Sequence, residues 1–427
     1  MLLGIKNDAN EQGTDRVVLG YDLDDFNAQI SYCPLGSYDA ETVSSVMGNQ
    51  IYDIPTVLCK RLEVNQWYYG REALRQAETG AGTLVEGLFE KARKGIPVIV
   101  EDEEYDPVLL LSLFVKKSIS ILSAVVPLSK IAGVMFTTDK IDEQNVKIFN
   151  TIVEGLSLKT KLVYFQSHVE SLYYYTIHQP KDVWNGQVLA CEYEKDMMIT
   201  HRLEFNRNTT PVVSFSETEK FNNIEIGNKD RNFLNILHKN CDGRYVSSVQ
   251  LIGNGFKEEW YKDSLKYMCV NRRVFAGNNL YSKGACYGVL EKISPSDVGR
   301  EYIYLGKDKL KANVGMEVMR RGQKSYLALL DAGVNWYEVG ASVEFVLQED
   351  KVLEFVISSL IGNKVYKEAM VLEELPERKA GTTRVKLMMK MVSDSTIYVE
   401  VEDLGFGEFY PATGKKWEKE IILNMQE

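Results

Sequence analysis

The chain has 427 residues, of which 45% are hydrophobic and 26% charged, an ordinary globular balance with room for two or three domains. Its formal net charge is −10, and its basic residues do not gather into a stripe. We therefore expect no nucleic-acid partner, because such a protein needs a positive surface for the phosphates. Residues 1–10 lack the apolar core of a signal peptide, so we expect a cytoplasmic protein.

The most apolar windows are residues 107–112 and 113–126. Lys116 and Lys117 interrupt them, which predicts a buried or amphipathic helix and no membrane insertion. The six cysteines and four histidines are dispersed, without a CxxC pair or a zinc-binding spacing. We expect the thiols to act as small buried hydrophobic groups.

The first two thirds of the chain mix strand and helix patterns. Residues 17–23 form an apolar run that ends in an acidic turn, and residues 28–32 alternate, so the two predict a hairpin. Further strands are expected at 54–58, 66–69, 96–100, 133–136, 162–165, 187–192, 198–205 and 249–252, and helices at 107–122, 142–154, 169–177, 233–241, 257–267 and 282–290. This order predicts a layered α/β domain whose strand–helix pattern occurs twice in the sequence.

Helical periodicity vanishes in the last third of the chain. Residues 342–347, 385–388 and 396–402 have strand patterns, and turn residues separate them. We expect an all-β domain there, with a boundary near Gly299. The predicted domains are residues 1–298, with lobe I at 1–180 and a reduced lobe II at 181–298, and residues 299–427.

Four motifs occur in order along the first domain. Their sequences are GYDLDDFNA at 20–28, IPTV with GREA at 54–57 and 70–73, VQLIGNGF at 249–256, and SKGACYG at 282–288. They resemble the first phosphate loop, the I-P-S-x-V … G-x-x-A pair, the adenosine motif and the closing helix of the DnaK-type heat-shock chaperones, which belong to the actin superfamily. The resemblance implies an α/β actin-like (ribonuclease H-like) two-lobed nucleotide-domain fold.

The same resemblance implies a set of ligand contacts. The cofactor would be ATP or ADP with magnesium, and Asp22 would be the carboxylate on the magnesium side. The implied cofactor contacts are Asp22, Asn27, Gly253, Asn254, Gly255 and Gly284. For Gly253 and Gly255 a tight strand-to-helix turn is the alternative that we favour. For Asp24 and Asp25 we favour a solvated acidic turn.

The last third of the chain extends the resemblance. Residues 384–415 resemble the final strands of the chaperones' substrate-binding β-sandwich, with Asp394, Asp403 and the turn at 413–415 in matching places. This implies a C-terminal all-β sandwich and a polypeptide or protein partner. Alternation along these strands predicts that about half of Met388, Met389, Met391 and Tyr398 lie in the core.

Both phosphate loops depart from the family pattern. The second loop should contain three glycines, but residues 192–197 are EYEKDM, and the segment that should build a helical subdomain in lobe II is largely missing. Asp24, Glu194, Lys195 and Asp196 replace loop glycines. A carboxylate about 4 Å from a phosphate oxygen costs about 4 kcal/mol at an effective dielectric constant near 20. Two or three such pairs would offset a micromolar affinity, which is about 8 kcal/mol.

The family's water-activating glutamate falls at Gln166, and an amide cannot act as a general base. We therefore expect no catalytic residue, although Asp22 and Gln166 occupy the family's positions. The leading hypothesis is a chaperone-like protein-interaction protein with a degenerate, non-hydrolysing ATPase domain. The alternatives are an active ATP-dependent chaperone with atypical loops and an actin-like structural protein that polymerises.

Overall fold

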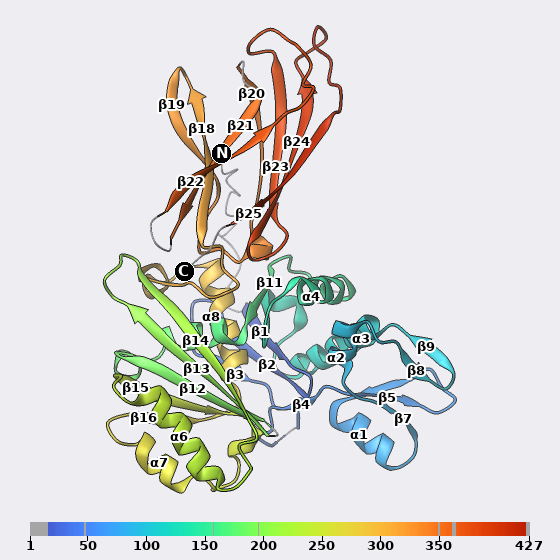
Figure 1. The fold of residues 1–427 in the computed structure, drawn as a ribbon. Coiled ribbons are helices and arrows are strands. Elements are labelled where there is room, and N and C mark those ends of the chain that lie inside the picture. Colours follow the sequence, from blue (N-terminus) through green and yellow to red (C-terminus); the bar gives the residue numbers. More distant parts are fainter. Residues whose placement is uncertain are drawn as a thin grey trace. The chain divides into compact units, whose positions relative to one another are not determined.

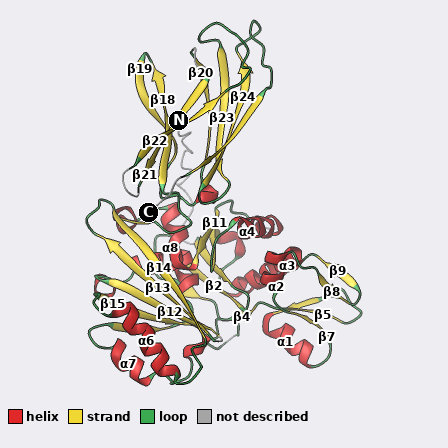
Figure 2. Ribbon diagram, viewed as in Figure 1, coloured by secondary structure: helices red, strands yellow, loops and turns green. Residues whose placement is uncertain are grey.

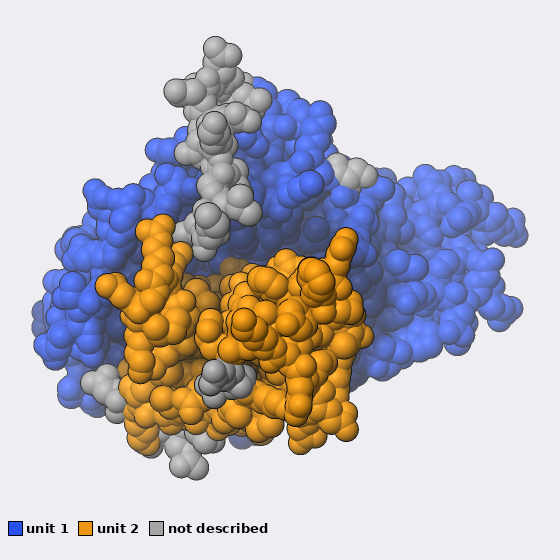
Figure 3. Space-filling view, turned by 90° about the horizontal axis from the view of Figure 1, so that it is seen from above, with its two compact units in different colours: residues 1–304 blue, residues 305–427 orange. Residues whose placement is uncertain are grey.

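The computed structural model describes residues 16–46, 48–156, 158–194, 196–348, 351–360 and 364–423, and it divides into two compact units (Figures 1 and 3). Unit 1 ends at Tyr304 and unit 2 begins at Leu305, whereas the sequence placed this boundary near Gly299. The difference arises because β17 (Tyr302–Tyr304) adds a parallel strand beside β14 (Val212–Asn222) in unit 1.

The first sheet of unit 1 has the order β11-β10-β1-β2-β3, with β4 also paired to β2. β1 pairs antiparallel with β2 and parallel with β10, and β10 pairs parallel with β11. The bounds are β1 (Val17–Leu23), β2 (Asn27–Pro34), β3 (Glu41–Thr42), β4 (Ile54–Pro55), β10 (Ile131–Thr138) and β11 (Val163–Ser167).

The second sheet repeats this arrangement. Its order is β16-β15-β12-β13-β14-β17, in which β12 pairs antiparallel with β13 and parallel with β15. The bounds are β12 (Gln187–Glu194), β13 (Met197–Asn206), β15 (Val246–Ile252) and β16 (Arg273–Ala276). The two sheets therefore share one strand order over their first five strands, as the repeated strand–helix pattern predicted.

A large insertion separates β3 from β10 in the first half of unit 1 (Figure 2). It contains β5 (Leu58–Arg61), β6 (Trp67–Tyr69), α1 (Gly70–Glu78), β7 (Gly82–Val85), α2 (Leu88–Lys94), β8 (Val98–Val100), β9 (Glu103–Tyr105) and α3 (Pro107–Ile119). In the second half, α6 (Lys229–Cys241) begins soon after β14 ends at Asn222. The second half thus has a short connection at the place where the first half has its insertion.

The residues Pro107–Ala124 are long and apolar enough to cross a membrane by length and composition. Half of this stretch is buried within the structure, as is common for core helices. Its helix α3 begins at Pro107, and the Asp106 side chain accepts hydrogen bonds from the amides of Val108 and Leu109. Packing inside unit 1 thus accounts for half of this stretch, whereas Leu109 remains 63% exposed.

Helices cover the outer faces of both sheets. Phe149 of α4 (Glu143–Gly155) stacks on Phe136 and Phe165 of the first sheet. Phe233 and Leu237 of α6 pack in one core with residues of β12 and β15, and α7 (Lys262–Met268) joins that core. The inner faces of the two sheets are left for two further helices.

Each of these two helices, α5 (His168–Ile177) and α8 (Leu280–Ile293), packs on the sheet that it does not follow in the sequence. α5 follows the first sheet in sequence, yet Leu172 and Tyr173 pack on the second. α8 follows the second sheet, yet Ala285 and Val289 pack on the first. The exchange brings the two helices into close contact with each other between the sheets.

Glycine makes this contact possible. A Cβ added at Gly284 of α8 would lie 2.0 Å from the carbonyl oxygen of Ser171 in α5. A Cβ added at Gly20 of β1 would lie 2.0 Å from the carbonyl oxygen of Ser282. Real side chains do not approach so closely, so both positions require glycine for packing.

Unit 2 consists of two four-stranded antiparallel sheets, β19-β18-β21-β22 and β20-β23-β24-β25. The bounds are β18 (Ala312–Arg320), β19 (Gln323–Leu330), β20 (Gly340–Leu347), β21 (Val352–Ser359), β22 (Val365–Val371), β23 (Thr383–Met391), β24 (Thr396–Gly405) and β25 (Lys416–Ile422). This confirms an all-β C-terminal domain. Met389 and Met391 are buried, whereas Met388 and Tyr398 face the other side of their strands, as alternation predicted.

Asp403 holds one end of the second sheet of unit 2 together. The buried carboxylate receives two hydrogen bonds from Arg378, at 2.7 and 2.8 Å, and two more from the amide and hydroxyl of Thr413, at 3.0 and 2.7 Å. Burial alone would raise the pKa of Asp403, but these donors hold it well below its usual value. The carboxylate thereby fixes the turn at 413–415 to the end of β24.

Replacing Gly284 with alanine should lower the free energy of unfolding by about 2–4 kcal/mol, because the new methyl group would force α5 and α8 apart. Chemical denaturation followed by circular dichroism measures this change. The matched control is Gly155→Ala in α4, whose Cβ would lie 3.7 Å from its nearest neighbour, Ser112 Cβ. The control should be neutral or slightly stabilising. Equal effects of the two substitutions would contradict the packing role.

Candidate functional site

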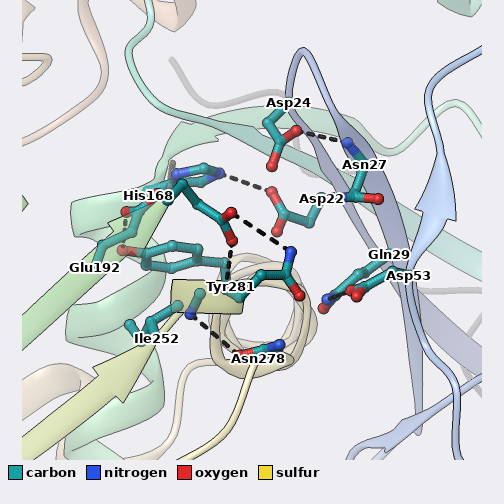
Figure 4. A pocket seen from close by; sticks show the side chains of 13 residues that line it. Asp22, Asp24, Asn27, Gln29, Asp53, His168, Glu192, Ile252, Asn278 and Tyr281 are labelled. Atoms are coloured by element: carbon teal, nitrogen blue, oxygen red, sulfur yellow. Dashed lines mark hydrogen bonds and ion pairs between the residues drawn. The ribbon is translucent and has the colours of Figure 1, made fainter. Parts of the chain in front are cut away.

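A pocket of unit 1 lies where the carboxyl ends of strands from both sheets meet (Figure 4). Ligand sites of open α/β sheets form at such strand ends. The first half contributes Asp22, Asp24, Asn27, Gln29, Asp53 and His168, and the second half contributes Glu192, Glu194, Ile252, Gly253, Asn254, Asn278 and Tyr281. The cavity is small, with a volume of about 40 Å³.

A chain of polar contacts crosses from one sheet to the other through this pocket. The side chain of Ser167 caps α5, so that His168 stands at the start of the helix, and its Nε2 lies 2.7 Å from Asp22 Oδ1. The imidazole stacks on the ring of Tyr281, with centroids 4.0 Å apart and an interplanar angle of 6°. The Tyr281 hydroxyl donates to Glu192 Oε2 at 2.8 Å.

Neighbouring groups determine the protonation states of the residues in this series of polar contacts. Burial opposes protonation of His168, but the charge of Asp22 and the hydrogen bond to it raise the pKa of the imidazole to about 9. Burial would also raise the pKa of Glu192, but the nearby imidazole of His201, 3.9 Å away, and the charge of His168 lower it to about 2. At neutral pH these pKa values favour the charged forms of both the buried His168 imidazole and the Glu192 carboxyl group.

The β1–β2 turn is closed by its own carboxylate. Asp24 Oδ1 accepts hydrogen bonds from the amides of Phe26, at 2.6 Å, and Asn27, at 2.7 Å. The Asp24 amide also donates to the Asn27 carbonyl at 3.0 Å. Burial, together with the nearby charge of Asp22, raises the pKa of Asp24 to about 7. The backbone donors that a phosphate would need in this turn are thus already occupied.

The opposite wall is occupied in the same way. Glu194 Oε1 accepts a hydrogen bond from the Asn254 amide at 2.6 Å, and the amide of Gly253 donates to Asn278 Oδ1 at 3.1 Å. Burial raises the pKa of Glu194. Gly253 has a φ of 101°, and a Cβ there would lie 2.4 Å from the Tyr193 carbonyl oxygen, so this position requires glycine. Of the other substituted loop residues, Asp196 accepts from the Glu225 amide at 3.3 Å, and Lys195 lies outside the described residues.

Comparison with known proteins gives a family but no activity. The family model described as the C-terminal part of a family of unknown function, DUF5716, matches residues 39–307, which is more than half of the chain. The chain belongs to the DUF5716 family. A second model, a domain of unknown function designated DUF8552, matches residues 309–423. No functionally curated protein matches the chain.

In this DUF5716 protein, four of the predicted contacts meet in the pocket: Asp22, Asn27, Gly253 and Asn254. Gly255 and Gly284 do not line it. A Cβ at Gly255 would lie 2.0 Å from the Tyr193 ring, and Gly284 contacts the α5 backbone, so both glycines serve packing.

Gln166, which the resemblance to the DnaK-type chaperones placed at the catalytic position, also lies outside the pocket lining. It is fully buried, its Nε2 donates to Ser171 Oγ at 2.7 Å, and its Oε1 faces Gly288 of α8. Conversely, Asp24 was predicted to be solvated but lies half-buried in the lining. The turn hydrogen bonds that favour Asp there also draw its carboxylate inward.

The sequence reasoning missed several lining residues, namely Gln29, Asp53, His168, Asn278 and Tyr281. One signal was present: His168 comes three residues after the strand predicted at 162–165, and polar residues at the ends of parallel strands gather at one sheet edge. Tyr281 offered no such signal, because its place depends on α8 crossing to the first sheet.

A second candidate site lies in unit 2, where two strands diverge. β18 and β21 pair only between Ala312–Gly315 and Val356–Ser359. Further along, β18 remains paired with β19, and β21 remains paired with β22. A groove of about 460 Å³ lies between them, lined by residues 316–319, 345–348 and 352–354 together with Val356 and Lys367.

The free energy of unfolding should fall as the pH rises from about 6.5 to about 9. The pKa of His168 is about 9 in the folded chain and 6.5 ordinarily, so its stabilisation is complete below pH 6.5 and is lost as the pH passes 9. Denaturation across this range should show that His168→Gln removes a contribution on the order of 2 kcal/mol at about pH 6 and little at about pH 10.

The matched control for this experiment is His238→Gln. His238 is exposed and pairs with Asp242 on the surface of α6. Its replacement should therefore leave the pH dependence of the free energy of unfolding unchanged. If the free energy of unfolding depends on pH equally in the wild type and in His168→Gln, the pairing of His168 with Asp22 is contradicted.

Proposed function

We propose that this chain is a chaperone-like protein-interaction protein. Its first unit would be an actin-like, two-lobed domain that no longer hydrolyses ATP, and its second unit would bind an extended polypeptide. The repeated strand order and the pocket at the strand ends support the fold. The observation that carries the function is the divergence of β18 from β21.

The contents of the pocket argue against a nucleotide. A site for one water molecule needs about 10–15 Å³ on the same measure, so a cavity of about 40 Å³ holds only a few waters. Asp24 and Glu194 also occupy backbone donors on both walls. A triphosphate would have to displace these contacts and then face the carboxylates themselves.

The groove in unit 2 has the features of a strand-addition site. Residues 316–320 of β18 and 352–355 of β21 face each other without pairing within the described part of the chain. An extended peptide placed there could pair with both edges, and the apolar side chains of the lining would give it pockets. Met319 and Val352 are 57% and 41% exposed, which leaves apolar surface available.

Calorimetry with ATP and ADP tests the first part of this proposal. We expect no binding heat with or without magnesium, because the phosphate-facing amides are already bonded. Adenosine alone serves as the control for a base-only site. Magnesium-dependent ATP turnover that Asp22→Ala abolishes would overturn the proposal in favour of an active ATP-dependent chaperone.

A peptide array tests the second part. Val352→Arg puts a charged side chain into the groove and should weaken the binding of selected peptides at least about tenfold, a loss of about 1.4 kcal/mol. The matched control is Val365→Arg in β22, where the side chain is 66% exposed and does not line the groove. Peptides that bind both variants as well as the wild type would exclude the groove.

A further inference from the structure

The pocket of unit 1 has acceptor groups left over. Gln29 lines the pocket, is only 6% exposed, and donates from Nε2 to Asp53 Oδ1 at 2.7 Å. Its Oε1 and the Oδ1 of Asn254, a second lining residue, are buried acceptors that have no hydrogen-bond partner among the described residues. Buried amide oxygens rarely remain unbonded, so a donor is expected at this place.

The charge of the pocket selects the kind of donor. Five carboxyl groups line the pocket, those of Asp22, Asp24, Asp53, Glu192 and Glu194. Among the described lining residues, His168 has the one basic side chain. Three of these carboxyl groups come from the first half of unit 1 and two from the second. An anion is disfavoured by this lining, whereas a group that carries both N–H donors and positive charge suits it.

The chain already brings one ammonium group to the edge of this pocket. Lys257 Nζ lies 3.9 Å from Asp53 Oδ2, and its side chain is 63% exposed. Among the described residues, no group of three or more His, Cys, Asp or Glu side chains is placed to hold a metal ion. A compact head that donates hydrogen bonds therefore fits the small cavity better than a metal does.

We propose that this pocket is a receptor for an ammonium group, supplied either by a small primary amine or by a lysine side chain of a partner protein. The ammonium would donate to Gln29 Oε1 and Asn254 Oδ1 and lie among the carboxylates of both walls. The site would thus bind a cation at the sheet edge where the resemblance implied a phosphate. This inference does not rest on the peptide groove of unit 2.

Thermal unfolding of the full chain at constant ionic strength tests the proposal, with methylammonium as the probe. Methylammonium should raise the midpoint in a saturable manner. Tetramethylammonium, which has the same charge but no N–H donor, should not. Gln29→Leu should weaken the apparent Kd for methylammonium at least about tenfold, the value of a hydrogen bond to a charged group.

Two further variants separate binding from folding. Lys257→Met should tighten the binding of methylammonium, because it removes a competing cation, and its exposed position leaves the core untouched. Glu78→Gln, on the surface of α1 and outside the lining, should leave the Kd unchanged. Unchanged binding in both Gln29→Leu and Lys257→Met would overturn the assignment.

The source of the ammonium is read from two probes. A blocked Gly-Lys-Gly peptide that binds at least tenfold more tightly than methylammonium, and more tightly than its norleucine analogue, assigns the site to a partner's lysine. Equal or weaker binding of the peptide assigns it to a small amine. Three outcomes would overturn the proposal: equal effects of the two ammonium ions, displacement of methylammonium by equimolar magnesium, or no saturable binding.

Discussion

The close approach of α5 and α8 is the constraint on which the rest of unit 1 depends. Each helix follows one sheet and packs on the other, so the two sheets are joined by exchange of their last helices. The exchange works only because Gly284 lets the helices touch and Gly20 lets α8 approach β1. It also carries His168 and Tyr281, at the starts of these helices, into stacking contact at the strand ends. The geometry of the pocket is thus a consequence of helix packing.

Once the strand ends meet, the identity of a few residues decides which ligand charge they favour. Glycine at the two turns would leave backbone N–H groups free for an anion. Asp24 and Glu194 instead bond those groups and add negative charge. These two side chains therefore occupy backbone donors that an anion would use, and we propose that the pocket binds a cation instead. Such a fold can accommodate pockets of different charge, since packing and pocket charge depend on different residues.

Local pattern predicted most of the α-helices and about half of the strands, and the resemblance implied four of the thirteen lining residues. The β1–β2 hairpin and helices such as α4 and α5 carry strong periodicity, and they form close to the predicted bounds. β14 was missed because its polar alternation lacks an apolar run, and the helix predicted at 257–267 begins only at Lys262, after a turn in which the Trp260 indole bonds the Gly255 carbonyl. Motif position found Asp22 and Asn254, but Tyr281 and Asp53 reach the pocket through tertiary packing, which no short motif records.

The polar chain from Asp22 through His168 and Tyr281 to Glu192 is not explained by stability alone. Burying charged groups carries a desolvation cost that often matches their mutual attraction, and apolar residues of similar volume would serve a core equally well. The buried imidazolium of His168 is therefore better understood as a group that specifies one arrangement of the strand ends around it. It connects the ends of both sheets, and its charge helps to lower the pKa of Glu192. Beside this series, Gln29 and Asn254 keep acceptor oxygens that no donor in the described part of the chain reaches.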